Sequence, residues 1–183
     1  MAKQLTADDA RQSLTAHAES KGLEVYMRFG PQIGWAELQR LLEDRAYVRY
    51  PCEIVFDAEL LQPGEFAHPV QKGEHPEDGF TMYVHPFFET QLDHVPALVL
   101  YQLVALNYGE FASSGDAESF GAAALGMTRD EYYDLLCDCA DQLGGPVQEM
   151  AMEASSCGHA HAHEAAHEPG AGGCGGGCSC GGH

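Results

Sequence analysis

The sequence predicts an α+β fold: one small mixed domain over residues 1 to about 146, followed by a disordered Gly/His/Cys-rich tail over 147–183. Three observations predict this. Residues 95–108 are apolar on nearly every side of a helix, so they should form a buried central helix. Short β-branched and aromatic runs indicate two or three strands, and helical apolar spacing indicates flanking helices. The chain beyond Cys157 has no apolar periodicity to offset the entropy of ordering.

The N-terminal region is expected to begin with a helix over 6–21, followed by a strand. Thr6 is a good N-cap, and acidic residues follow it in the first turn. Gly22 should end this helix, because glycine is common just past a helix C-terminus. Residues 23–29 then read as a short strand, and the Gly-Pro-Gln-Ile-Gly sequence over 30–34 reads as a turn.

The next segment is expected to hold a helix and two strands. Apolar residues at helical spacing predict an amphipathic helix over 35–45. Residues 47–60 read as a strand with an apolar centre, and Pro-Gly at 63–64 reads as a turn. A polar loop over 71–79 should lead to the next strand, over 80–84.

The C-terminal part of the domain is expected to be helical. The buried helix over 95–108 tolerates Pro96 because that residue falls in its first turn. Residues 116–125 should form a short alanine-rich helix. Thr128 is a suitable N-cap for a last helix over 129–143.

The charge balance limits the classes of partner. The 183 residues include 28 Asp and Glu but only nine Lys and Arg, giving a formal net charge of −19. Such a surface repels phosphate, so we expect no nucleic acid and no membrane partner. The N-terminal residues lack the apolar region of a signal peptide, and no apolar run approaches the ~18 residues of a membrane span. We therefore expect a cytoplasmic protein with reduced cysteines.

The strongest functional feature is a set of candidate metal ligands near the C-terminus. Four of the seven cysteines and five of the ten histidines fall there: Cys157, His159, His161, His163, His167, Cys174, Cys178, Cys180 and His183. Imidazole and thiolate are the ligands that zinc, nickel, cobalt and copper prefer. The alternating histidines could enclose one ion, and the last three cysteines with the final histidine make a plausible tetrahedral zinc set. A divalent transition metal, zinc or nickel, is the expected cofactor.

The composition of residues 157–183 resembles the Cys/His-rich tails of nickel-handling accessory proteins, notably prolyl isomerases of the SlyD type. The resemblance is confined to the tail, and the preceding domain has no visible match to that isomerase. It implies metal buffering or delivery, and nothing about isomerisation.

The order of elements over 47–127 resembles the minimal zincin scaffold of small gluzincin peptidases. Those proteins carry His-Glu-x-x-His on the buried helix and an acidic third ligand on the next helix. The matching residues are Tyr101-Gln102-Leu103-Val104-Ala105, and the third-ligand position falls near Asp116 or Glu118. Both histidines and the glutamate are absent. The resemblance therefore implies a scaffold that has lost peptidase chemistry, and the alternative is a generic α+β domain.

Other cysteines and histidines are weaker candidates. Cys137 and Cys139 are two apart on a predicted helix, so they should point to different faces. Scattered loop histidines could converge on a second metal ion, or could simply be polar surface: His68, His75, His85 and His94. Ligand geometry cannot be read from spacing this wide.

These observations favour a cytoplasmic transition-metal-binding protein, acting as a metal chaperone, buffer or store. Its partners would be the metal ion and a protein that receives it. Two alternatives remain: an enzyme with an unrecognised active site in the folded domain, or a catalytically inactive zincin-like interaction module. No phosphate-binding loop and no nucleophile motif supports a particular enzyme class.

Overall fold

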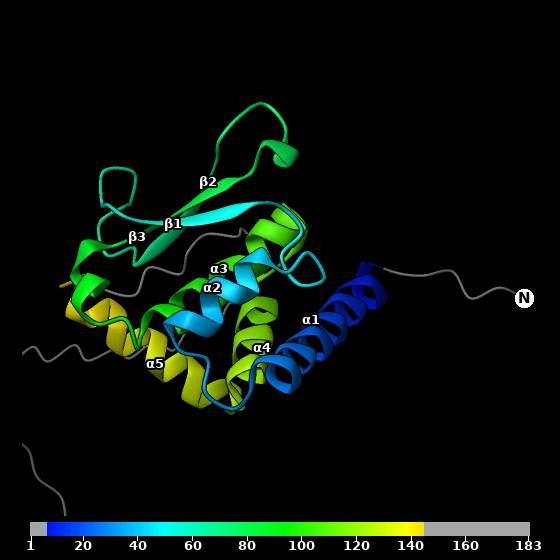
Figure 1. The fold of residues 1–183 in the computed structure, drawn as a ribbon. Helices are drawn as coiled ribbons and strands as arrows, with labels where there is room; N and C mark the ends of the chain where they lie inside the picture. The colour runs from blue at the N-terminus through cyan, green and yellow to red at the C-terminus, as the bar shows by residue number, and fades with distance from the viewer. Residues whose placement is uncertain (1–6, 145–183) are drawn as a thin grey trace, which may run out of the picture.

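The computed structural model describes residues 7–144, which form five α-helices and a three-stranded sheet. This confirms the predicted α+β class. The sheet lies along one side of the domain and the helices lie on the other (Figure 1). Three short 3₁₀ turns connect the larger elements: η1 (Pro76–Asp78), η2 (Pro86–Thr90) and η3 (Gly109–Phe111).

Helix α1 (Ala7–Phe29) is longer than the sequence predicted. Gly22 does not end it, and the strand predicted over 23–29 is wrong. Gly22 lies where α1 crosses α4 (Ser114–Leu125), and a Cβ atom there would collide with the Phe120 carbonyl oxygen. The glycine therefore allows two helix backbones to approach closely, which is a second use of its small size.

Helix α1 ends at Gly30, whose φ of 91° is favourable only for glycine and whose N–H donates to the Tyr26 carbonyl oxygen at 3.0 Å. Residues 30–34 contain no helix or strand, in agreement with the predicted turn. Helix α2 (Trp35–Glu43) then confirms the predicted amphipathic helix. Its buried residues are Leu38, Leu41 and Leu42.

The sheet has the order β1-β3-β2. Strand β1 (Cys52–Phe56) is shorter than the predicted strand over 47–60, and it pairs in parallel with β3 (Phe80–Val84). Strand β3 matches its predicted bounds. Strand β2 (Ala67–Gln71) pairs with β3 in antiparallel orientation.

The composition of β2 gives no signal of a strand. The strand reads Ala-His-Pro-Val-Gln, with one β-branched residue and a proline that cannot donate to the ladder. Pro69 is opposite Met82 in the register and is accommodated because β2 is an edge strand. The predicted turn at 63–64 is present, and the predicted loop over 71–79 contains η1.

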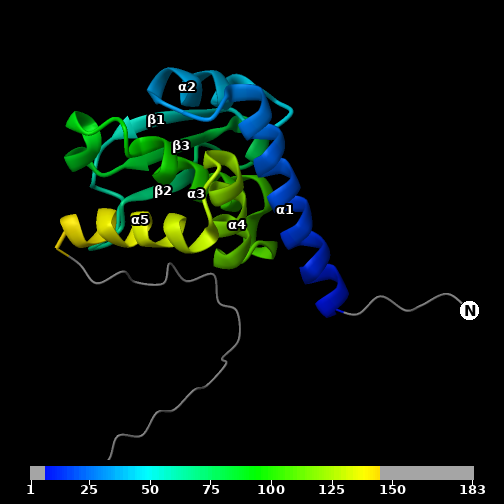
Figure 2. The ribbon, with the colours of Figure 1, turned by 90° about the horizontal axis from the view of Figure 1, so that it is seen from below.

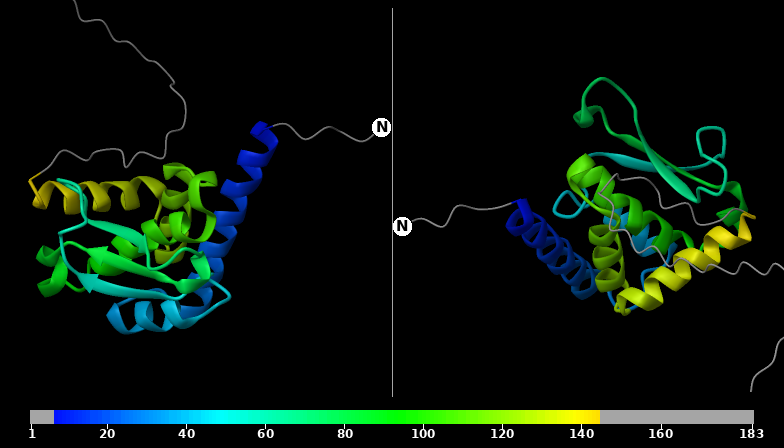
Figure 3. Two further views of the ribbon diagram at one scale, coloured as in Figure 1. Left: turned by 90° about the horizontal axis from the view of Figure 1, so that it is seen from above. Right: turned by 180° about the vertical axis from the view of Figure 1, so that it is seen from behind.

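Helix α3 (Val95–Tyr108) is the buried central helix that the sequence predicted. It contacts β2 and β3 on one side and α2, α4 and α5 elsewhere, so most of its faces are covered. Pro96 lies in its first turn and Gly109 follows its last residue, as expected. Figures 2 and 3 show α3 enclosed by the sheet and the other helices.

Helix α5 (Arg129–Gln142) packs on α3 and α4 through one buried tyrosine. Thr128 caps this helix as predicted, with its side chain accepting from Glu131 N–H. Tyr132 is fully buried, and its hydroxyl donates to the Ala97 carbonyl oxygen of α3 at 2.6 Å. Its ring occupies the space that a side chain at Gly121 of α4 would need. One side chain therefore joins α5 to both neighbouring helices.

The close approach of α1 and α4 can be tested by adding one methyl group. Gly22→Ala should lower the free energy of unfolding by about 1–3 kcal/mol through overpacking, although alanine favours helix over glycine by about 1 kcal/mol. Chemical denaturation followed by circular dichroism measures this.

Gly115→Ala is the matched control, because the nearest atom to its Cβ would be in the Arg129 guanidinium, at the end of a long side chain, at 3.1 Å, and the Ser113 hydroxyl would lie at an ordinary contact distance of 3.7 Å. We expect this variant to be as stable as the natural protein or more stable. An equal or higher stability of Gly22→Ala would contradict our account of that glycine.

Candidate functional site

The predicted metal ligands of the tail, from Cys157 to His183, lie outside the described residues, as does the predicted boundary near residue 146. Within residues 7–144, no three His, Cys, Asp or Glu side chains come together in a way that could hold a metal ion. The other candidate residues named from the sequence lie within these residues.

The central helix carries no metal ligand at the positions that match the zincin motif. Gln102 is buried in the core, at 3% exposure, and Tyr101 packs its ring edge-on against Phe66 at 6.1 Å between centroids. Ala105 has no ligating group. This part of α3 contributes packing, and we find no arrangement of its residues that could activate a water molecule.

The two acidic residues near the third-ligand position have structural roles. Asp116 is 4% exposed. It accepts hydrogen bonds from the Thr15 hydroxyl of α1 at 2.5 Å and from the Ser113 N–H and hydroxyl at 2.8 Å. Glu118 forms an ion pair with Arg129 at 2.6 Å. Asp116 thus caps α4 and joins it to α1, and Glu118 joins α4 to α5.

The four histidines that were expected in loops do not form a shared set of ligands in the described part of the chain, and His68 lies in strand β2 and not in a loop. His75 precedes η1, and His85 Nδ1 accepts from the Phe87 N–H at 3.2 Å. His94 packs edge-on against Phe88, and its buried Nδ1 has no hydrogen-bond partner among residues 7–144.

The fourth histidine, His68, is held by a carboxylate. Its Nδ1 lies 3.1 Å from Glu65 Oε1. The hydrogen bond to Glu65 raises the pKa of His68 above its ordinary value, against the opposing effect of partial burial. The side chain is 48% exposed, so solvent screens the pair and its contribution to stability is small.

Two of the three cysteines within residues 7–144, Cys52 and Cys139, have thiols whose pKa is raised by burial. Burial raises the pKa of the Cys52 thiol to about 11, and burial followed by the charge of Asp138 raises the pKa of Cys139 to about 11. Both thiols stay protonated at neutral pH, whereas the thiolate is the metal ligand. Cys139 is buried and Cys137 is partly exposed, which confirms that the two point to different faces of α5.

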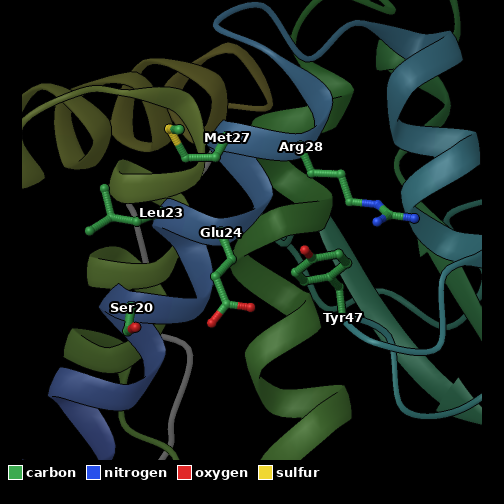
Figure 4. A pocket seen from close by; sticks show the side chains of 6 residues that line it. All are labelled: Ser20, Leu23, Glu24, Met27, Arg28 and Tyr47. Carbon is green, nitrogen blue, oxygen red and sulfur yellow. The ribbon is translucent and has the colours of Figure 1, made fainter.

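A shallow groove follows the outer side of α1, and we call it the α1 groove. It is lined by Ser20, Leu23, Glu24, Met27, Arg28 and Tyr47 (Figure 4). Leu23 is 51% exposed and Met27 is 81% exposed, although both are large apolar side chains. Glu24 pairs with Lys21 at 2.8 Å, and Arg28 pairs with Asp44 at 2.8 Å.

This groove does not follow from a first helix that ends at Gly22, as the sequence predicts. A continuous helix places Leu23 and Met27 on the same exposed face as Ser20, since they are three and seven residues further along. The signal was present in the spacing, but the predicted strand over 23–29 concealed it.

Comparison of the chain with protein-family models, with curated proteins and with solved structures finds no match. None of the helices within residues 7–144 combines the length and the apolar character that crossing a membrane requires.

The pair of His68 and Glu65 predicts a measurable titration. In the natural protein, NMR of the His68 ring should give a pKa above its ordinary ~6.5, and Glu65→Gln should return it toward that value. Because the folded-state pKa is raised, the pair stabilises the fold below about pH 6.5 and loses this effect as the pH rises through the folded-state pKa. An identical His68 pKa in the two proteins would show that the pair does not form in solution.

Proposed function

We propose that this protein binds a divalent transition metal, zinc or nickel, through its C-terminal tail and buffers, stores or delivers it. The observation that carries the proposal is the concentration of nine soft and borderline ligands between Cys157 and His183. We place this activity in the cytoplasm, where thiols stay reduced and available to the metal.

The described residues support a division of roles between domain and tail. The domain's buried carboxylate, Asp116, is occupied by Thr15 and Ser113, and its more buried thiols have high pKa values. No three potential ligands converge within residues 7–144. A metal ion would therefore find its ligands in the tail, where cysteines and histidines follow one another closely in the sequence.

In this proposal, the folded domain carries the tail to a protein that receives the metal. The net charge of −19 attracts cations weakly and without selectivity, so it would raise their local concentration without choosing among them. Selection would come from thiolate and imidazole.

A second candidate function is an interaction module without catalysis. The exposed Leu23 and Met27, one turn apart on α1, favour it, because neighbouring large apolar side chains on a domain surface can mark a contact site. The two functions are compatible, and removal of the tail separates them.

Metal titration tests the tail directly. Apo protein titrated with zinc or nickel in a calorimeter should show at least one tight site, and a variant lacking residues 157–183 should show none, because each tail cluster offers about the four ligands that one zinc ion needs. The truncated variant should keep the thermal midpoint of the metal-free full chain. Unchanged tight binding after truncation would contradict the proposal and would favour a site in the domain.

The two ligand groups should differ in metal preference and share a dependence on pH. Replacing Cys174, Cys178 and Cys180 with Ser should weaken zinc more than nickel, because zinc favours thiolate more strongly. Replacing His159, His161 and His163 with Ala should have the reverse effect and weaken nickel more than zinc. Equal effects of both variants on both metals would refute separate clusters.

The affinity of the natural protein for metal should fall as the pH is lowered from about 7.5 to about 5.5, since protons compete with the metal for thiols of pKa ~8.5 and imidazoles of pKa ~6.5.

A further inference from the structure

The outer face of α1 carries a row of exposed residues with the spacing of a helix–helix contact. The row consists of Ser13, Ala16, Ser20, Leu23 and Met27, which are alternately three and four residues apart. This average spacing of about 3.5 residues keeps one side of a helix facing a partner helix. The opposite face of α1 already packs on α4, through Ala18, Gly22 and Val25. Among residues 7–144, the side chains of the outer row are exposed, so packing within the described part of the chain does not account for them.

The row changes in size along the helix. Its N-terminal half has small side chains, at Ser13, Ala16 and Ser20, and its C-terminal half has the large exposed Leu23 and Met27. The α1 groove borders the large half, with Tyr47 on its other side (Figure 4). The small half of the same helix extends toward the edge of the molecule, where a neighbouring chain could reach it (Figure 2).

We propose that α1 packs against α1 of a second copy of this chain, in antiparallel orientation. The row is self-complementary in that orientation: Leu23 faces the partner's Ser20, and Met27 faces the partner's Ala16. Each large side chain then meets a small one, and the two-fold symmetry repeats both contacts, as in most closed homodimers. The small half of one helix occupies the α1 groove of the other.

The flanking acidic residues favour the antiparallel orientation, although Glu24 is already paired with Lys21 at 2.8 Å. Glu19 and Glu24 are exposed on opposite sides of the row. In a parallel pair, each Glu19 would lie beside the partner's Glu24, and two such like-charge contacts are unfavourable. In the antiparallel pair with the register above, Glu24 lies beside the partner's His17 and Glu19 beside the partner's Tyr26. The acidic groups are then separated, and a carboxylate meets an imidazole.

Sedimentation of the full chain over a concentration series tests the proposal. A chelator and a reductant are present, so that neither tail-bound metal nor a disulfide joins two chains. We expect a reversible equilibrium between monomer and dimer. Leu23→Glu with Met27→Glu should raise the dissociation constant at least about tenfold, because both large contacts are lost. The matched control is Leu60→Glu, at an apolar residue of similar exposure (49%) away from α1, which should leave the constant unchanged.

An exchange of side chains tests the register and the identity of the partner together. Ala16→Met alone sets two methionines against each other, and Met27→Ala alone leaves a gap, so each single variant should weaken the dimer. The double variant restores one large and one small residue at every contact and should recover the natural dissociation constant. All of these residues are exposed, and Ala and Met are good helix formers, so circular dichroism should show folded protein throughout.

Three results would overturn the proposal. A natural chain that stays monomeric at every concentration would mean that the face serves a different partner or none. A dimer that resists Leu23→Glu with Met27→Glu would use another surface. A double exchange variant that stays as weak as the single variants would exclude this antiparallel register.

Discussion

The close packing of α1 on α4 at Gly22 is the contact on which the arrangement of the domain depends. A side chain at Gly22 would collide with the Phe120 carbonyl oxygen of α4, so the two helices could not keep their present separation. Because α1 passes through this crossing as one continuous helix, its inner face closes the core beside α3 and α4 and its outer face presents an uninterrupted row of side chains. A single glycine thus contributes to both the interior and the surface of the domain.

The chemistry of the described domain contrasts with that of the tail. Within residues 7–144, buried thiols have raised pKa values and the acidic residues near the zincin-like positions cap or pair with neighbouring helices. These groups stabilise the fold and offer little to an ion. The sequence over 157–183 places thiols and imidazoles close together, with no apolar residue larger than alanine or proline among them. This contrast is the basis for proposing that the domain carries the tail and that the tail binds the metal.

Sequence patterns predicted the elements whose signals are local and unambiguous. The apolar segment of α3, the run of β3 and the Thr128 cap of α5 each allow one interpretation, and the structure agrees. Gly22 allowed two interpretations, since a glycine that ends a helix and a glycine that lets a neighbouring helix approach look the same in sequence. Only the packing of α4 against α1 decides between them. Strand β2 depends on pairing with β3, which its own residues do not encode. The candidate ligands of the tail come from composition alone and stay a prediction, whereas the α1 groove depends on the full length of α1.

The most direct test of the central claim is the metal content of the protein as the cell makes it. The full chain and a variant ending at residue 156 are purified without a metal-affinity step and analysed by mass spectrometry of the elements. We predict that the full chain carries zinc or nickel in a reproducible ratio and that the truncated variant carries neither, although both are folded. Equal metal content in the two proteins, or none in either from metal-replete cells, would contradict the account.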